Sequence, residues 1–88
     1  MKFEYVRLPG KRVRCRVASN FFTRLLGMFW NESGLILRPC NQIHTFYGPK
    51  IDVYFMNECG DILASYMSVG YGEIVCHADA FQVVEIRC

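Results

Sequence analysis

The chain lacks any long hydrophobic run. None of its apolar stretches approaches the roughly 18 residues that a membrane-spanning helix needs. The start, Met1-Lys2-Phe3-Glu4, also lacks the apolar core of about 7 to 15 residues that defines a secretion signal. We therefore expect a cytoplasmic protein that has no membrane partner.

Linkers, internal repeats and low-complexity tracts are absent as well. A chain of 88 residues with 52% hydrophobic and 20% charged residues is long enough and apolar enough to fold by itself. We therefore treat residues 1–88 as a single domain.

The chain carries no strong excess of charge of one sign, because its formal net charge is only +2. Through Arg38 there are eight Lys or Arg and two Asp or Glu, and after it there are two and six. If the two halves interleave in one sheet system, opposite charges face each other and no large field of one sign results. The composition therefore predicts that nucleic acid is not a partner.

Paired close cysteines are missing, although the chain contains five cysteines, at positions 15, 40, 59, 76 and 88. An odd number of cysteines without a secretion signal favours reduced thiols over a disulfide framework. A structural zinc site typically uses motifs such as Cys-x-x-Cys, whereas only Cys40-x-x-x-His44 and Cys76-His77 occur here. The sequence therefore predicts no metal site and no cofactor.

Short apolar segments separated by turn residues at intervals near ten residues are typical of small β-sandwiches and β-barrels. Ser19 or Asn20 can cap one short helix near residues 20–27, which Gly27 ends. We expect a mainly β fold, all-β or α+β, in which short and largely antiparallel strands form a small barrel or sandwich. The expected strands are residues 3–8, 12–17, 35–38, 43–47, 51–57, 62–67, 73–77 and 82–87.

The residue types at two positions in the chain predict tight turns. Pro9-Gly10 joins the first two strands as a hairpin, and residues 57–61 form a hairpin loop in which Gly60 takes a positive φ. Cys59 in that loop is the expected exposed thiol, whereas Cys88 lies on a terminus that can fray.

The second strand alternates strictly, so that positions 13, 15 and 17 share one face and Arg12, Arg14 and Arg16 share the other. This phase predicts that Cys15 is a small buried hydrophobe. The arginine face is interpreted as a solvated or salt-bridged strand surface. A contact with an anion or phosphate is the alternative.

Several segments resemble one family when taken together. They are the Arg24–Met28 stretch, the segment RPCNQIHTFYGPKIDVYF at residues 38–55, and AFQVVEI at residues 80–86. In this order and approximate spacing the chain resembles the domain of unknown function 192 family. The resemblance implies a compact, mainly β domain with a short helix after an early strand, and it supplies no activity. The chain departs from the family by lacking a methionine in the link at residues 47–50.

One constellation could form a site. If residues 43–47 and 51–55 pair as an antiparallel hairpin around Gly48-Pro49-Lys50, His44, Phe46, Asp52 and Tyr54 share one face. That face gathers an imidazole, a carboxylate and a phenol, and the opposite face is core.

This constellation has three interpretations. In the first, the protein is a non-enzymatic binding module in which His44 and Asp52 anchor a small ligand, Phe46 and Tyr54 form apolar walls, and Cys40 and Gln42 lie at the edge. In the second, it is a small hydrolase or transferase in which Asp52 orients His44 and Cys40 is the nucleophile. In the third, His44 and Asp52 have a structural role only: they satisfy each other's hydrogen-bonding groups and those of nearby backbone, and they fix the register of the hairpin.

A protein–protein interaction module is a further alternative, if Met28-Phe29-Trp30 forms an exposed apolar patch. The expected partner is thus an unknown small molecule or a protein. The expected oligomeric state is a monomer or a weak dimer.

Overall fold

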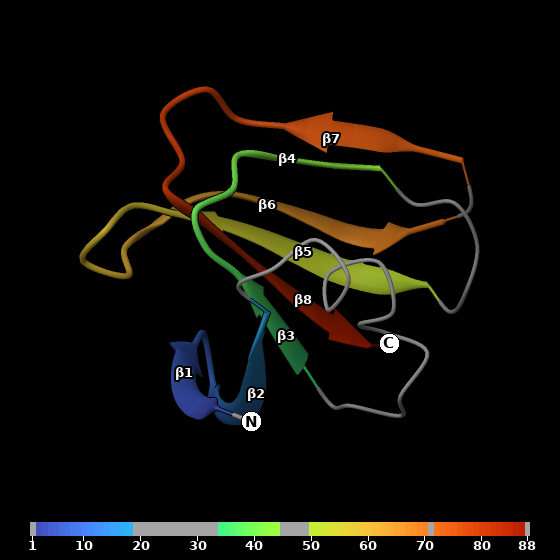
Figure 1. Ribbon diagram of the computed structural model, residues 1–88. Coiled ribbons are helices and arrows are strands. Elements are labelled where there is room, and N and C mark those ends of the chain that lie inside the picture. Colours follow the sequence, from blue (N-terminus) through green and yellow to red (C-terminus); the bar gives the residue numbers. More distant parts are fainter. Residues whose placement is uncertain (1, 19–33, 45–49, 71, 88) are drawn as a thin grey trace.

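The computed structural model describes residues 2–18, 34–44, 50–70 and 72–87 (Figure 1). These residues fold mainly into β-strands, as the sequence predicts, and no helix occurs among them. The helix expected near residues 20–27 and the Met28-Phe29-Trp30 segment lie outside the described residues. The strands are β1 (Phe3–Leu8), β2 (Lys11–Ala18), β3 (Gly34–Leu37), β4 (Gln42–His44), β5 (Ile51–Met56), β6 (Ile62–Val69), β7 (Ile74–Cys76) and β8 (Gln82–Arg87).

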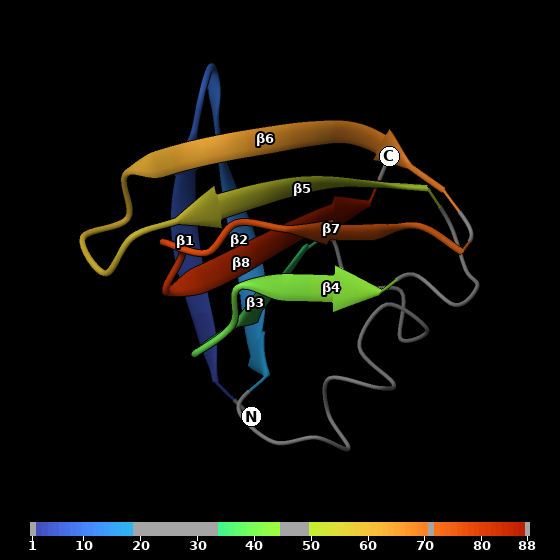
Figure 2. The ribbon, with the colours of Figure 1, turned by 90° about the horizontal axis from the view of Figure 1, so that it is seen from above.

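The strands form a six-stranded sheet in the order β1-β2-β3-β8-β5-β6 and a two-stranded sheet of β4 and β7. All pairings are antiparallel except β2 with β3, which run parallel and whose connection includes residues 19–33. The two-stranded sheet lies against one face of the larger sheet, and the β1–β2 hairpin crosses the direction of β5 and β8 (Figure 2).

The β1–β2 hairpin confirms the predicted turn at Pro9-Gly10. Leu8 pairs with Lys11, and Gly10 has a φ of 77°, which a glycine adopts without the steric cost that a side chain would add. The ladder has six residue pairs in all and ends at Phe3 opposite Arg16. Cys15 is fully buried, as predicted. Arg16 is also buried, because β3 pairs with β2 there, so the arginine face is exposed only at Arg12 and Arg14.

The predicted hairpin loop between β5 and β6 is confirmed as well. Gly60 has a φ of 89°. The Asn57 side-chain oxygen accepts hydrogen bonds from the Cys59 and Asp61 amides, both at 2.9 Å. The Asn57 amide in turn donates to the Asp61 carbonyl at 3.0 Å. Asparagine thus closes the loop with its own side chain, while glycine supplies the left-handed conformation.

Apolar side chains cover both faces of the six-stranded sheet. The Phe55 cluster lies on the face against which β4 and β7 pack. The Tyr54 cluster lies on the other face and joins β1 and β2 to β5, so the sheet curls until its edge hairpin packs over its centre. The Phe55 cluster is Ala18, Leu35, Leu37, Ile43, Ile51, Val53, Phe55, Val69 and Val83, and the Tyr54 cluster is Leu8, Cys15, Ile36, Tyr54, Met56, Val84 and Ile86.

The predicted hairpin between residues 43–47 and 51–55 is wrong. Ile43 pairs with Val75 of β7, and β5 lies between β8 and β6. Both backbone edges of β5 are therefore occupied by other strands. The reason is burial: five of the six β5 residues are buried, and a strand that is buried on both faces gains most at the centre of a sheet.

Close packing of β2, β3 and β8 makes Gly34 a sensitive position. A Cβ atom at Gly34 would lie 2.5 Å from the Cys15 Sγ and 2.8 Å from the Ile86 Cδ1. We expect Gly34→Ala to lower the free energy of unfolding by about 1 to 3 kcal/mol, because core atoms must shift.

Gly70→Ala is the matched control, because a Cβ at Gly70 meets nothing within 4 Å. Urea unfolding of both variants measures the difference. Equal stabilities for Gly34→Ala and Gly70→Ala would contradict the described packing.

Candidate functional site

Asp52 has a structural partner that the sequence did not indicate. Its Oδ1 accepts a hydrogen bond from the backbone amide of Ser68 at 2.9 Å. Ile51 pairs with Val69 and Val53 pairs with Tyr66, so β6 carries an extra residue there, and Ser68 has a φ of 54°. An extra residue in one strand leaves a backbone group outside the ladder. Asp52 therefore stabilises the β6 bulge, which accounts for an aspartate within a strand.

Tyr54 and the strand that carries His44 lie on opposite sides of the six-stranded sheet. Tyr54 is only 8% exposed and packs in the Tyr54 cluster. β4 instead contributes Ile43 to the Phe55 cluster on the other face. The His44 side chain and all of Phe46 lie outside the described residues. A shared ligand face of these residues stays a prediction, but the strand pairing from which it was inferred does not form.

Cys40 and Gln42 lie where the chain leaves β3 and enters β4. The Cys40 Sγ is half-buried at the margin of the Phe55 cluster and donates to the Gln42 carbonyl at 3.1 Å. The Cys40 amide donates to the Phe81 carbonyl at 2.9 Å. Gln42 is exposed and pairs with Cys76.

The predictions for Cys15 and Cys59 are confirmed. Burial, with a smaller contribution from the Glu4 charge, raises the pKa of Cys15 to about 11. Cys59 is exposed, and Cys88 lies outside the described residues. Cys15, Cys40, Cys59 and Cys76 all carry free thiols.

Glu85 is a buried carboxyl group that the sequence reasoning missed. It lies on β8 between Leu35 of β3 and Val53 of β5, on the face of the Phe55 cluster, and is 8% exposed. Desolvation raises its pKa to about 7. The sequence does indicate this burial, because Glu85 follows Val83 by two residues and alternate residues of a strand lie on the same face.

His77 is a half-buried imidazole beside the ring of Phe55. Its ring centroid lies 6.3 Å from that of Phe55, and its buried Nδ1 has no hydrogen-bond partner among the described residues. The neighbouring Cys76 is exposed. In the described ranges, no group of three or more His, Cys, Asp or Glu residues is placed to hold a metal ion.

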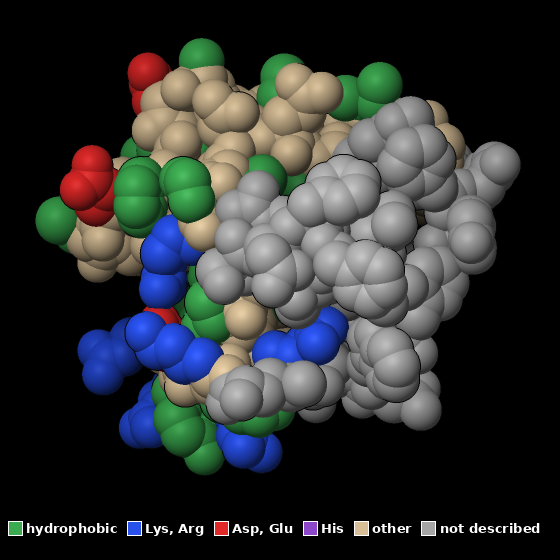
Figure 3. Space-filling model, in the orientation of Figure 1, with side chains coloured by type: hydrophobic (Ala, Val, Ile, Leu, Met, Phe, Trp, Pro, Cys, Tyr) green, Lys and Arg blue, Asp and Glu red, His purple; other side chains and the backbone are tan. Residues whose placement is uncertain are grey.

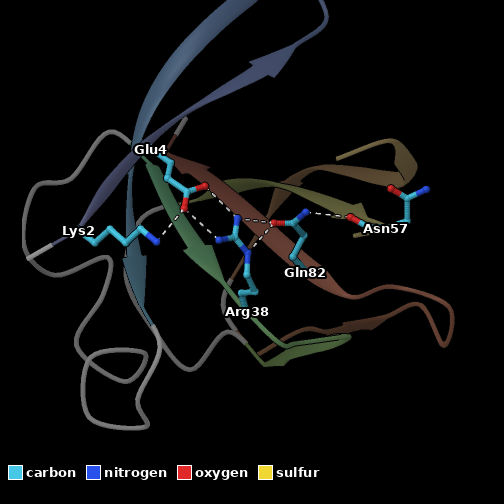
Figure 4. Close-up of polar contacts among 5 residues, drawn as sticks. All are labelled: Lys2, Glu4, Arg38, Asn57 and Gln82. Atoms are coloured by element: carbon cyan, nitrogen blue, oxygen red, sulfur yellow. Dashed lines mark hydrogen bonds and ion pairs between the residues drawn. The ribbon is translucent and has the colours of Figure 1, made fainter. Parts of the chain in front are cut away.

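Arg38 lies at the centre of a polar network (Figure 4). Its guanidinium forms two parallel bonds with the Glu4 carboxylate, at 3.0 and 3.1 Å, and donates twice to the Gln82 side-chain oxygen, at 3.0 and 2.8 Å. The Gln82 amide then donates to the Asn57 carbonyl at 2.8 Å. Arg38 lowers the pKa of Glu4 by this hydrogen bonding and by its charge. The network joins β1, the end of β3, β8 and the β5–β6 loop, and its role is structural.

Two exposed surfaces have side chains that could bind a partner. β6 is the last strand of the six-stranded sheet, and it exposes Ile62, Leu63, Tyr66 and Met67. The β1–β2 hairpin exposes Tyr5, at 65%, among several cationic side chains.

No helix in the described part of the chain is long and apolar enough to cross a membrane. No family model, curated protein or solved structure matches the chain. The resemblance to the domain of unknown function 192 family stays a prediction.

The raised pKa of Glu85 makes stability depend on pH. Its carboxyl ionises near pH 4.5 in the unfolded chain and near 7 in the folded protein. The contribution of the neutral, buried carboxyl to the free energy of unfolding is complete below the unfolded pKa and is lost as pH rises through 7. The loss over this window is about 3 kcal/mol. We expect Glu85→Gln to remove this dependence, as measured by urea unfolding at about pH 5 and pH 8. Parallel pH profiles for Glu85→Gln and the parent protein would contradict it.

Substitutions in the Arg38 network can distinguish the contribution of the forked guanidinium from that of a single positive charge. We expect Arg38→Lys to lower the free energy of unfolding by about 1 to 2 kcal/mol, because an ammonium cannot bond Glu4 and Gln82 together. Lys2→Ala, which removes the 3.6 Å ion pair of a 72% exposed side chain, should cost less than about 0.5 kcal/mol. Chemical denaturation compares the two. Similar costs would mean that the fork adds nothing.

Proposed function

We propose that the protein is a non-enzymatic binding module that associates through the free edge of β6, with a second copy of the same chain as the partner. The observation that carries the proposal is the edge strand itself. All eight residues of β6 are uncharged, and seven of them, all except Val69, are at least partly exposed. An exposed strand of this kind offers backbone donors and acceptors to another strand.

The opposite edge strand of the same sheet, β1, is protected against pairing with another chain. β1 carries Glu4 and Arg7 among its six residues, and charged side chains on an edge strand discourage pairing with another chain. β6 carries two bulges instead of charges, at Ser68 and near Leu63, and the segment between them keeps a regular register with β5. Because bulges also discourage edge pairing, the regular segment Ala64–Tyr66 between them is the part of the β6 edge that is open to a partner strand among the described residues.

Two features favour an identical strand as the occupant. An antiparallel pair of β6 strands around a two-fold axis closes on itself, so both free edges disappear in one dimer. An uncharged strand also meets its copy without repulsion between like charges. Pairing along one strand buries less than the standard interface of about 1,600 Å², so the dimer should be weak.

The other interpretations remain proposals with less support. The binding pocket of His44, Phe46, Asp52, Tyr54, Gln42 and Cys40 lacks its predicted hairpin. The enzyme alternative of Cys40, His44 and Asp52 has an aspartate that already accepts from the Ser68 amide. The β6 edge needs no such rearrangement.

Charge placed at Ser65, near the middle of β6, tests the dimer. Antiparallel self-pairing brings position 65 of one copy close to position 65 of the other, and Ser65 is exposed, so the fold should tolerate substitution. We expect Ser65→Lys and Ser65→Glu to be monomers, because like charges meet across the axis. An equimolar mixture should associate again. Sedimentation velocity over a concentration series measures all three states.

Ile74→Lys is the control, because Ile74 is 59% exposed on β7, which belongs to the two-stranded sheet and does not pair with β6. It should associate like the parent protein. A parent protein that stays monomeric at every concentration would overturn the proposal, and so would dimers that survive Ser65→Lys.

A further inference from the structure

We infer that the outer face of the β1–β2 hairpin is a binding site for single-stranded nucleic acid. This inference stands apart from the β6 edge and does not depend on the dimer. It also reverses the expectation that the two charged halves of the chain neutralise each other, because the described contacts show where the positive charges lie.

The register of the hairpin sorts its side chains into two different faces. Leu8, Cys15 and the partly buried Val6 and Val13 pack into the Tyr54 cluster. Glu4 belongs to the same phase and is held by Arg38. The other face, which we call the arginine ladder, consists of the laterally paired residues Phe3 with Arg16, Tyr5 with Arg14, and Arg7 with Arg12. Arg16, which pairs with Leu35 of β3, is buried, so the exposed guanidinium groups of this face are those of Arg7, Arg12 and Arg14.

Four exposed cations of this hairpin have no acidic partner among the described residues. Arg7, Lys11, Arg12 and Arg14 are exposed, and within the described residues none of them forms an ion pair. Lys and Arg side chains gather over β1 and β2 in the lower part of the molecule (Figure 3). Such an unpaired cationic strip attracts a polyanion.

Aromatic rings hold two of the guanidinium groups in place. The Arg12 Cζ lies 4.9 Å from the centroid of the Tyr5 ring, and the Arg14 Cζ lies 4.0 Å from that of Phe3. A guanidinium stacked on a ring keeps its N–H edges free for the forked contact with phosphate oxygens. Because the planes are already ordered, less side-chain entropy is lost when an anion binds.

The spacing and the exposed ring favour a nucleic-acid strand over other polyanions. Arg12 and Arg14 are two residues apart on one strand, which separates them by about 7 Å along it. This separation is close to that of successive phosphates in a nucleic-acid chain. Tyr5 is 65% exposed beside them and can stack on an unpaired base. An anionic membrane surface or an acidic peptide would use the charges alone.

Salt dependence provides the test, with a fluorescent deoxythymidine strand of about 12 nucleotides as the probe. Four cations predict a slope of log affinity against log salt near about −3, because each phosphate neutralised on a single strand contributes about −0.7. We expect the double variant Arg12→Gln and Arg14→Gln to reduce this slope by about half and to weaken binding roughly tenfold at low salt. Fluorescence anisotropy measures both quantities.

Two further variants separate stacking from charge. Tyr5→Ala should weaken binding roughly tenfold and leave the salt slope unchanged. Lys50→Gln is the control, because Lys50 is an exposed cation just before β5, three strands from β2 in the sheet order. It should change neither the affinity nor the slope. Melting temperatures of all variants establish that the fold is kept.

Three results would overturn the inference. The first is no binding of the strand at low salt. The second is an equal loss of affinity in Lys50→Gln and in the arginine double variant. The third is tighter binding to a matched duplex, or to vesicles of anionic phospholipid at equal phosphate concentration, than to the single strand.

Discussion

The fold depends on β8 being buried on both of its faces. Val83 contributes to the Phe55 cluster, and Val84 and Ile86 contribute to the Tyr54 cluster. β3 and β5 pair with β8 from either side, so the central ladder holds one strand from each half of the chain against it. The curled β1–β2 hairpin then covers one face and the β4–β7 pair covers the other. Both clusters would lose a wall without β8.

The same constraint explains why the pKa of one carboxyl group is raised. A strand that is buried on both faces has no side from which Glu85 can reach bulk water, so its neutral form is favoured. Arg38, at the ends of the strands, differs from Glu85 because it has polar partners. There the guanidinium finds both Glu4 and Gln82, and its charge keeps the Glu4 carboxylate ionised.

Local features of this fold could be predicted from the sequence, whereas the pairing of distant segments could not. Pro9-Gly10 and the Asn57–Asp61 loop carry their geometry in neighbouring residues, and both hairpins form as expected. The link at 48–50 has turn residues too, but β5 gains more by lying between β8 and β6. That gain depends on residues far along the chain. Asp52 shows the same limit, because its partner Ser68 follows from a bulge that no local pattern announces.

The burial of Cys15 gives the protein an internal reporter of its own opening. Its thiol is fully buried, and its pKa of about 11 leaves little thiolate at neutral pH. Cys59, on an exposed loop, meets a reagent without any structural change. Alkylation at position 15 must therefore wait for the strands around it to separate. The ratio of the two labelling rates thus records how often the sheet opens under native conditions, with no denaturant added.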